Sequence, residues 1–149
     1  MAGIINKPRL EIEIIDETWA EIRATFEIDW NINPIDDLHR IRVEVWGDDS
    51  PLRDDRLAAA DYETPTFYRL SGHDVFTITG TQRVLRALLD EDKGRGVFPR
   101  PRNRRDIDEV YVVGYLQVLS PRTSATGTRL VWTQLGDKSK KSNVISGTF

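Results

Sequence analysis

Residues 18–31 contain the feature that most constrains the fold, an uninterrupted alternation of apolar and polar side chains. Charged residues or threonine separate six apolar residues, namely Ala20, Ile22, Ala24, Phe26, Ile28 and Trp30. A period of two over this length predicts a β-strand with one buried face and one wet face. A helix would scatter the same six residues around its circumference, so the pattern favours a strand.

Further strands are predicted on both sides of this segment. Residues 10–14 and 40–46 repeat the alternation in shorter form, and the connections between them are too short for crossover helices, which favours antiparallel pairing. Residues 109–119 are apolar or aromatic on both faces, which predicts a central strand covered on both sides. Other strands are expected at 66–70, at 75–79 with an end at Gly80, at 128–135 and at 143–149.

The connecting segments are rich in residues that favour turns. The sequence predicts a short helical turn at 57–60, a loop at 93–105, a polar turn at 121–127 and a hairpin loop at 136–141. Residues 82–89 carry apolar side chains at helical offsets, so this segment is either a short helix or a bulged strand.

These elements predict an all-β fold, an antiparallel two-sheet β-sandwich of seven to nine strands with at most one short helix. Residues 1–149 are expected to form one domain of immunoglobulin-like or C2-like architecture, although the Cys…Trp…Cys spacing of antibody domains is absent. A chain of 149 residues can bury a core without disulfides. The absence of cysteine also excludes thiolate catalysis and sulfur-ligated metals.

The expected location is the cytoplasm. No apolar run approaches the roughly 20 residues that cross a bilayer, and the first residues lack the basic start and long apolar stretch of a secretory signal. Release within a particle, by lysis or by a specialised machine, stays open.

Acidic loops form the first candidate site. The candidate metal ligands are Asp48, Asp54, Asp90 and Asp92. Calcium takes six to eight oxygen ligands, which carboxylates from several loops can supply. The six-residue separation of Asp48 and Asp54 resembles that of the loop aspartates of C2 domains, and this resemblance implies calcium as a ligand. The later Asp-x-Asp lacks the flanking aromatic residue of that pattern, and solvated acidic loop ends are the alternative.

A basic loop forms the second candidate site. It contains five arginines, namely Arg95, Arg100, Arg102, Arg104 and Arg105. Arginine forks match carboxylates and phosphates, but nucleic acid is disfavoured because the net charge is -3 and the loop offers one aromatic residue, Phe98, for stacking. An acidic protein surface, including that of a second copy, is the preferred partner, and a merely solvated loop is the alternative.

The tryptophans form the third candidate. Trp30 is in phase with the buried positions of its strand and is assigned to the core. Trp19 and Trp46 are out of phase, which predicts a role at an interface, since exposed tryptophans are enriched there. A carbohydrate platform that includes Trp132 is the alternative.

No catalytic motif is recognisable, since the two histidines lack the spacing of a zinc site and no nucleophile elbow or phosphate-binding loop occurs.

The charges are segregated along the chain: residues 1–94 contain 20 acidic and 11 basic side chains, and residues 95–149 contain 4 acidic and 10 basic side chains. Unlike surfaces suit head-to-tail contacts. The chain is therefore expected to be a non-catalytic structural or protein-interaction module. The expected setting is a homo-oligomer or a repeating assembly, such as a filament, shell or phage-type particle. The alternative is an accessory domain that binds calcium or carbohydrate; no other cofactor is expected.

Overall fold

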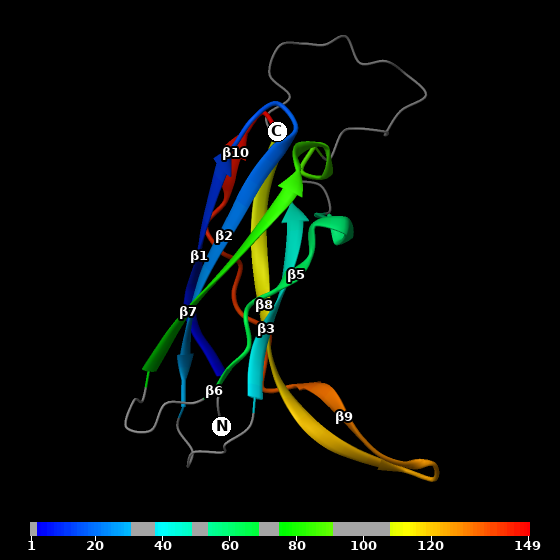
Figure 1. The fold of residues 1–149 in the computed structure, drawn as a ribbon. Coiled ribbons are helices and arrows are strands. Elements are labelled where there is room, and N and C mark those ends of the chain that lie inside the picture. The colour runs from blue at the N-terminus through cyan, green and yellow to red at the C-terminus, as the bar shows by residue number, and fades with distance from the viewer. Residues whose placement is uncertain (1–2, 31–37, 49–53, 69–74, 91–107) are drawn as a thin grey trace.

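The computed structural model describes residues 3–30, 38–48, 54–68, 75–90 and 108–149. They form two antiparallel β-sheets that pack against each other (Figure 1). The predicted all-β, two-sheet sandwich is therefore confirmed. The described residues contain ten strands, of which three have only two residues, and two single-turn 3-10 helices.

The smaller sheet, sheet A, has the strand order β1-β2-β7. Its strands are β1 (Gly3–Ile14), β2 (Trp19–Asp29) and β7 (Val75–Leu85). The central strand β2 is the alternating segment, and its inward side chains from Ala20 to Ile28 are completely buried. Trp30, just beyond the strand, is 6% exposed, so the prediction of a core tryptophan is confirmed.

The larger sheet, sheet B, is built around β3 and β8 in the order β10-β8-β3-β4. Its main strands are β3 (Leu38–Gly47), β8 (Asp108–Ser124), β9 (Gly127–Gln134) and β10 (Ile145–Gly147). Three short strands pair with β3, namely β4 (Asp55–Arg56), β5 (Tyr62–Glu63) and β6 (Phe67–Tyr68). The predicted helical turn is the 3-10 helix η1 (Ala58–Ala60).

The core lies between the inward faces of β2, β3 and β8. Phe26 is fully buried, and a Cβ added to Gly114 would lie 2.3 Å from its ring, so glycine makes room for the aromatic side chain in the facing sheet. At one end of the sandwich, Trp30 meets the buried His39 edge to face at 4.7 Å, and Phe67 stacks on the same imidazole. This cluster closes that end of the core.

The predicted end of a strand at Gly80 is wrong, because β7 continues to Leu85 and pairs with β2 over its whole length. Gly80 is needed for close packing instead: a Cβ there would lie 2.7 Å from the Thr64 side chain, and the Gly80 carbonyl accepts a hydrogen bond from Tyr62. The ambiguous segment 82–89 is strand up to Leu85 and then the 3-10 helix η2 (Arg86–Leu88).

The predicted polar turn at 121–127 is also wrong, because β8 runs to Ser124 and β9 begins at Gly127. Pro121 is tolerated within β8 because pairing with β3 stops at Val118. Pro121 lies opposite Leu130 of β9, but its other edge faces no strand among the described residues, and a proline whose nitrogen lies on such an edge removes no ladder hydrogen bond.

The segment between β9 and β10 follows the edge of β8 and does not form the predicted hairpin loop. Ser139 and Ser142 each make two hydrogen bonds to β8. The Ser139 N–H donates to the Gly114 carbonyl and its Oγ accepts from the Gly114 N–H, both at 2.8 Å. Ser142 makes the same pair of bonds to Val112, at 3.0 and 2.9 Å. The two serines thus continue the hydrogen bonding of the sheet across an irregular stretch.

The last predicted strand is shorter than expected, since β10 covers only three of residues 143–149. Asn143 uses its side-chain amide in place of its backbone: Oδ1 accepts from the Leu10 N–H at 2.7 Å, and Nδ2 donates to the Leu10 carbonyl at 3.0 Å. This amide joins β1 of sheet A to the segment that precedes β10 in sheet B.

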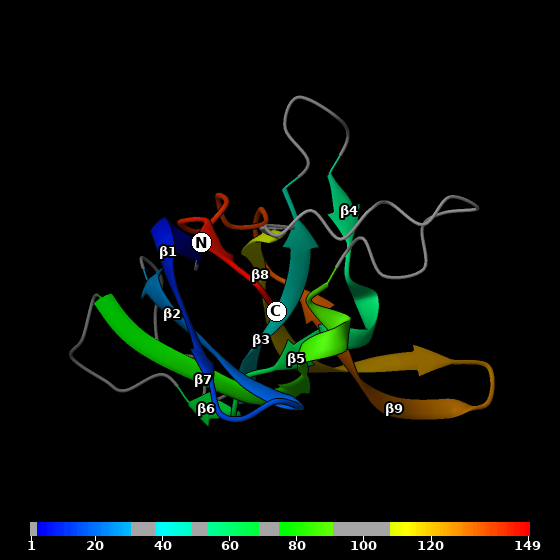
Figure 2. The same cartoon turned by 90° about the horizontal axis from the view of Figure 1, so that it is seen from above.

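Beyond residue 118, β8 and β9 leave the sandwich as a two-stranded ribbon, which Figure 2 shows reaching away from both sheets. In the described part of the chain, no helix has the length and hydrophobicity to cross a bilayer.

Candidate interaction surfaces

The outer face of sheet B is the first candidate surface, because alternation along β3 places a charged or aromatic side chain at each outward position from Arg40 to Trp46. These outward residues are Arg40, Arg42, Glu44 and Trp46, and their partners in register on β8 are Gln117, Tyr115, Val113 and Tyr111. Arg40 lies 4.2 Å from the ring centroid of Trp132, and Arg42 lies 4.5 Å from that of Tyr115. The face is therefore built from cation–π and charged contacts.

Glu44 is at the centre of this face and is only 4% exposed, although its position in the alternation predicts a solvated side chain. Its carboxylate lies 2.9 Å from Arg42 and 3.0 Å from Arg56, and Arg56 also pairs with Asp61. Burial alone would raise the pKa of Glu44, but hydrogen bonds from Tyr115 and Arg42 and the charge of Arg56 outweigh it and lower the pKa. The carboxylate therefore stays ionised and paired.

The first two candidate calcium ligands, Asp48 and Asp54, do come together on this face, around Lys141. The ammonium nitrogen lies 3.7 Å from Asp48 and 3.0 Å from Asp54, and the Tyr111 hydroxyl donates to Asp54 at 2.8 Å. The hydrogen bond to Asp54 and the charges of both carboxylates raise the pKa of Lys141, so the side chain stays charged.

This arrangement gives the two carboxylates a shared cation from the chain itself. Lys141 would have to move away before a calcium ion could take its place. Asp90 lies beyond η2 at the end of a described segment, and Asp92 falls outside the described residues. Among the residues that the structure describes, no three His, Cys, Asp or Glu side chains gather as metal ligands would.

The candidate interface tryptophans are both half-buried and lie on different sheets. Trp46 stacks on Tyr111 with a ring separation of 6.3 Å and an interplanar angle of 7°. Trp19 begins β2 on sheet A, with the Arg83 guanidinium 5.9 Å from its ring centroid. The five candidate arginines (Arg95, Arg100, Arg102, Arg104 and Arg105) lie outside the described residues. The interface assignment of all seven side chains stays a prediction.

The ribbon of β8 and β9, defined here as residues 119–132, is the second candidate surface. Every residue from Pro121 to Leu130 is exposed, and Leu130 alone exposes 63% of its surface. Arg122 lies directly opposite Arg129 in the register of the two strands. Like charges in that relation destabilise a strand pair, and the ribbon contains no acidic residue.

The third candidate surface lies at the turn between β1 and β2, at the end of the sandwich opposite the ribbon (Figure 1). Asp16 shapes this turn: its Oδ1 accepts hydrogen bonds from the N–H groups of Thr18 and Trp19, both at 2.8 Å. These bonds lower the pKa of Asp16. Exposed apolar side chains lie close by, at Ile14 (44% exposed), Ile15 (38%) and Leu85 (39%).

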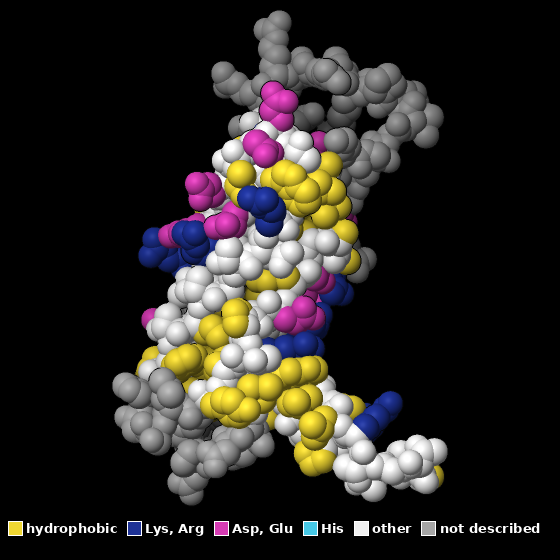
Figure 3. All heavy atoms as spheres, viewed as in Figure 1, with side chains coloured by type: hydrophobic (Ala, Val, Ile, Leu, Met, Phe, Trp, Pro, Cys, Tyr) yellow, Lys and Arg dark blue, Asp and Glu magenta, His cyan; other side chains and the backbone are white. Residues whose placement is uncertain are grey.

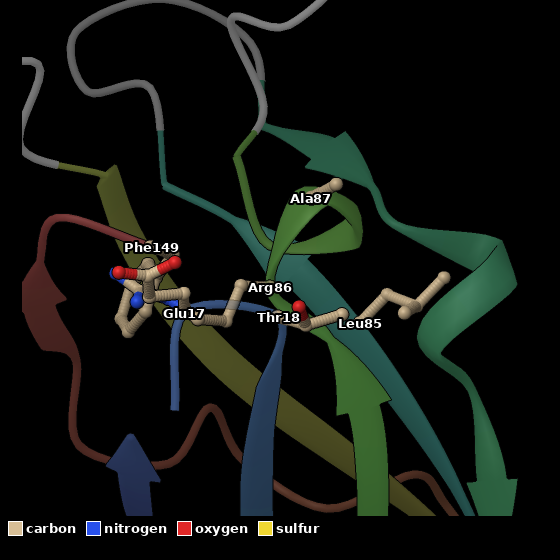
Figure 4. Close-up of a pocket in the computed structure, with 6 residues that line it drawn as sticks. All are labelled: Glu17, Thr18, Leu85, Arg86, Ala87 and Phe149. Carbon is tan, nitrogen blue, oxygen red and sulfur yellow. The ribbon is translucent and has the colours of Figure 1, made fainter. Parts of the chain in front are cut away.

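A pocket of about 340 Å³ opens at this same end (Figure 4). Its lining residues are Glu17, Thr18, Leu85, Arg86, Ala87 and Phe149. The Arg86 guanidinium is held there by two backbone carbonyls, those of Asp16 and Thr148, each at 3.0 Å. These bonds position Arg86 in the wall of the pocket.

On the face that Figure 3 shows, acidic side chains and a basic group lie near the upper end, a basic group projects from the ribbon, and apolar patches lie near each end. Sequence reasoning singled out neither the ribbon nor the turn. Residues 121–127 were predicted as a polar turn, and their sequence has no apolar–polar alternation that would mark a strand.

Comparisons with protein-family models, with curated proteins and with solved structures found no match for this chain.

Proposed function

We propose that this chain is a non-catalytic structural module whose copies associate with one another into a homo-oligomeric or repeating assembly. The observation that carries the proposal is the ribbon, an ordered two-stranded arm whose side chains from Pro121 to Leu130 make little contact with the rest of the described chain. A partner that covers this arm would account for its length and composition.

Such an arm has little stability of its own in water. An isolated two-stranded hairpin is at best marginally stable in water, and this one also carries the opposed Arg122 and Arg129. Both of its edges lack a neighbouring strand among the described residues, since β3 pairs with β8 only as far as Val118. Free edges of this kind add readily to another chain.

The remaining surface supports a structural role over a catalytic one. Glu44 and Asp61 neutralise Arg42 and Arg56 on the outer face of sheet B. Lys141, the cation beside Asp48 and Asp54, has a raised pKa and supplies no free amine near neutral pH. Groups paired in this way stabilise a surface and are poor general acids or bases.

Sedimentation velocity of the full chain over a wide range of concentrations tests the proposal. The mean mass should rise with concentration for the natural chain and stay at the monomer for the ribbon variant Arg122→Gln/Arg129→Gln/Leu130→Gln. The control variant Thr77→Gln/Thr81→Gln alters exposed positions of β7 and should associate like the natural chain. A natural chain that is monomeric at every concentration would overturn the proposed function.

A further inference from the structure

We infer that the ribbon of one copy docks on the β1–β2 turn of the next, so that copies join head to tail. This inference rests on the proposed function and names the two surfaces that meet. The docking surface on the second copy, called the acceptor end below, consists of residues 13–19 and 21 with Leu85 and the adjoining pocket.

The positions of the ribbon and the acceptor end support this contact. The ribbon leaves the sandwich at one end of its long axis, and the β1–β2 turn lies at the other (Figure 1). The two surfaces of one copy are therefore too far apart to meet within that copy. A contact between unlike surfaces at opposite ends leaves one of each free on every added copy, so it continues as a ring or a filament.

Exposed apolar side chains on both surfaces also support this contact. Leu130 is the most exposed large apolar residue of the described chain, at 63%. The acceptor end offers exposed Ile14, Ile15 and Leu85 beside a pocket of about 340 Å³. Burying these groups against one another removes apolar surface from water, which is the main favourable contribution to most protein association.

The opposite charges of the ribbon and the acceptor end also favour their contact. The ribbon contains Arg122 and Arg129 in opposition, whereas on the acceptor end Glu13 lies directly opposite Glu21. Each like-charge pair is unfavourable by itself. Contact between the two ends would relieve both.

The neighbours of the glutamate pair strengthen the acidic character of this end. Asp16, with its lowered pKa, and Glu17 in the pocket wall add two carboxylates. The nearby Arg86 is engaged by the backbone carbonyls of Asp16 and Thr148, and Glu21 also binds Arg23 at 2.9 Å. Glu13 and Glu17 can thus meet the ribbon arginines, whose guanidinium groups are suited to carboxylates.

The test uses two variants of the full chain in which the chosen side chains are replaced by neutral glutamine. No charge is reversed, so no new attraction is created. The ribbon variant is Arg122→Gln/Arg129→Gln/Leu130→Gln, and the acceptor variant is Glu13→Gln/Ile15→Gln/Glu17→Gln. All six positions are exposed, so both variants should keep the melting temperature of the dilute natural chain.

Each variant alone should sediment as a monomer, and an equimolar mixture should form a dimer that does not grow. Such a dimer has one intact junction, which only a contact between unlike surfaces can give. If the acceptor variant assembles like the natural chain, or the mixture stays monomeric, the ribbon docks elsewhere and this inference fails while the proposed function stands. Binding of duplex DNA that is lost in the ribbon variant and kept in the acceptor variant would overturn the inference as well.

Discussion

The two halves of β8 belong to one strand but occupy opposite environments. From Val110 to Val118 the strand pairs with β3 on one side, and β10, the two serines and β9 cover its other edge. From Leu119 to Ser124 it pairs, among the described residues, with β9 alone, and its last four residues are exposed. The backbone is extended in both halves, so the difference lies in what covers them.

This contrast separates two sources of order. The first half is held by burial and by neighbours on both edges, whereas the second half has only the hydrogen bonds of one hairpin. Stability of an extended segment comes mainly from side-chain packing and burial, so the ribbon gains little within a single copy. We therefore expect substitutions in the first half to change folding and substitutions in the second half to change association.

The largest difference should come from truncating one apolar side chain that packs against the first half of β8 and one that lies in the ribbon. Phe26→Ala removes the ring that fills the space above Gly114 and should lower the free energy of unfolding by about 3–5 kcal/mol. Leu130→Ala should change it by less than about 0.5 kcal/mol, because the side chain is exposed. Urea denaturation at low protein concentration measures both values. Equal losses of unfolding free energy would contradict the difference between the packed half of β8 and the ribbon.

Glu44→Gln should have the next largest effect, because it leaves Arg42 and Arg56 without their shared carboxylate. We expect a loss of about 2–3 kcal/mol at neutral pH. The pKa of Glu44 in the folded state is lower than its ordinary value of 4.5, so the ionised carboxylate stabilises the fold above that pH. The contribution disappears as the pH falls through the lowered pKa.

The difference in stability between the natural chain and Glu44→Gln should therefore be constant above about pH 5 and shrink in acid. Denaturation at a series of pH values measures it. Glu27→Gln, on the exposed face of sheet A, is the matched control and should give a small difference. A gap that widens in acid would contradict the pairing described for Glu44.

The smallest effect concerns the serines on the edge of β8. Ser139→Ala and Ser142→Ala should each cost about 1 kcal/mol, because each leaves one backbone N–H of β8 without its acceptor. Amide exchange should accelerate at Gly114 and Val112 respectively. Thr123→Ala in the ribbon removes a hydroxyl that meets Thr128 at 3.4 Å in an exposed position and should leave both stability and these amides unchanged.

Much of the fold was predictable because its information is local. The alternation from Ala20 to Trp30 and the apolar faces of residues 109–119 report burial directly, and both strands are confirmed. Gly80 and Pro121 misled the prediction because both residues usually interrupt strands. Their tolerance depends on Thr64 and on the end of β3, contacts from distant parts of the chain.

The candidate sites were less predictable, because each depends on groups brought together by the fold. The proximity of Asp48 and Asp54 followed from their spacing, but Lys141, which pairs with both, is more than 80 residues away in sequence. The burial of Glu44 depends in the same way on Arg56 and Tyr115. The ribbon was missed because Pro121 and the polar residues after it are typical of a turn, so the sequence predicted a turn where the two strands continue.

Amide hydrogen exchange of the ribbon at low and high protein concentration tests the central claim most directly. If a second copy covers the ribbon, the amides from Arg122 to Leu130 should exchange rapidly in dilute solution. At concentrations where the chain associates, their exchange should slow by at least tenfold, while Val112 and Gly114 stay protected throughout. Ribbon amides that exchange at the same rate in both conditions, while the chain demonstrably associates, would contradict the account.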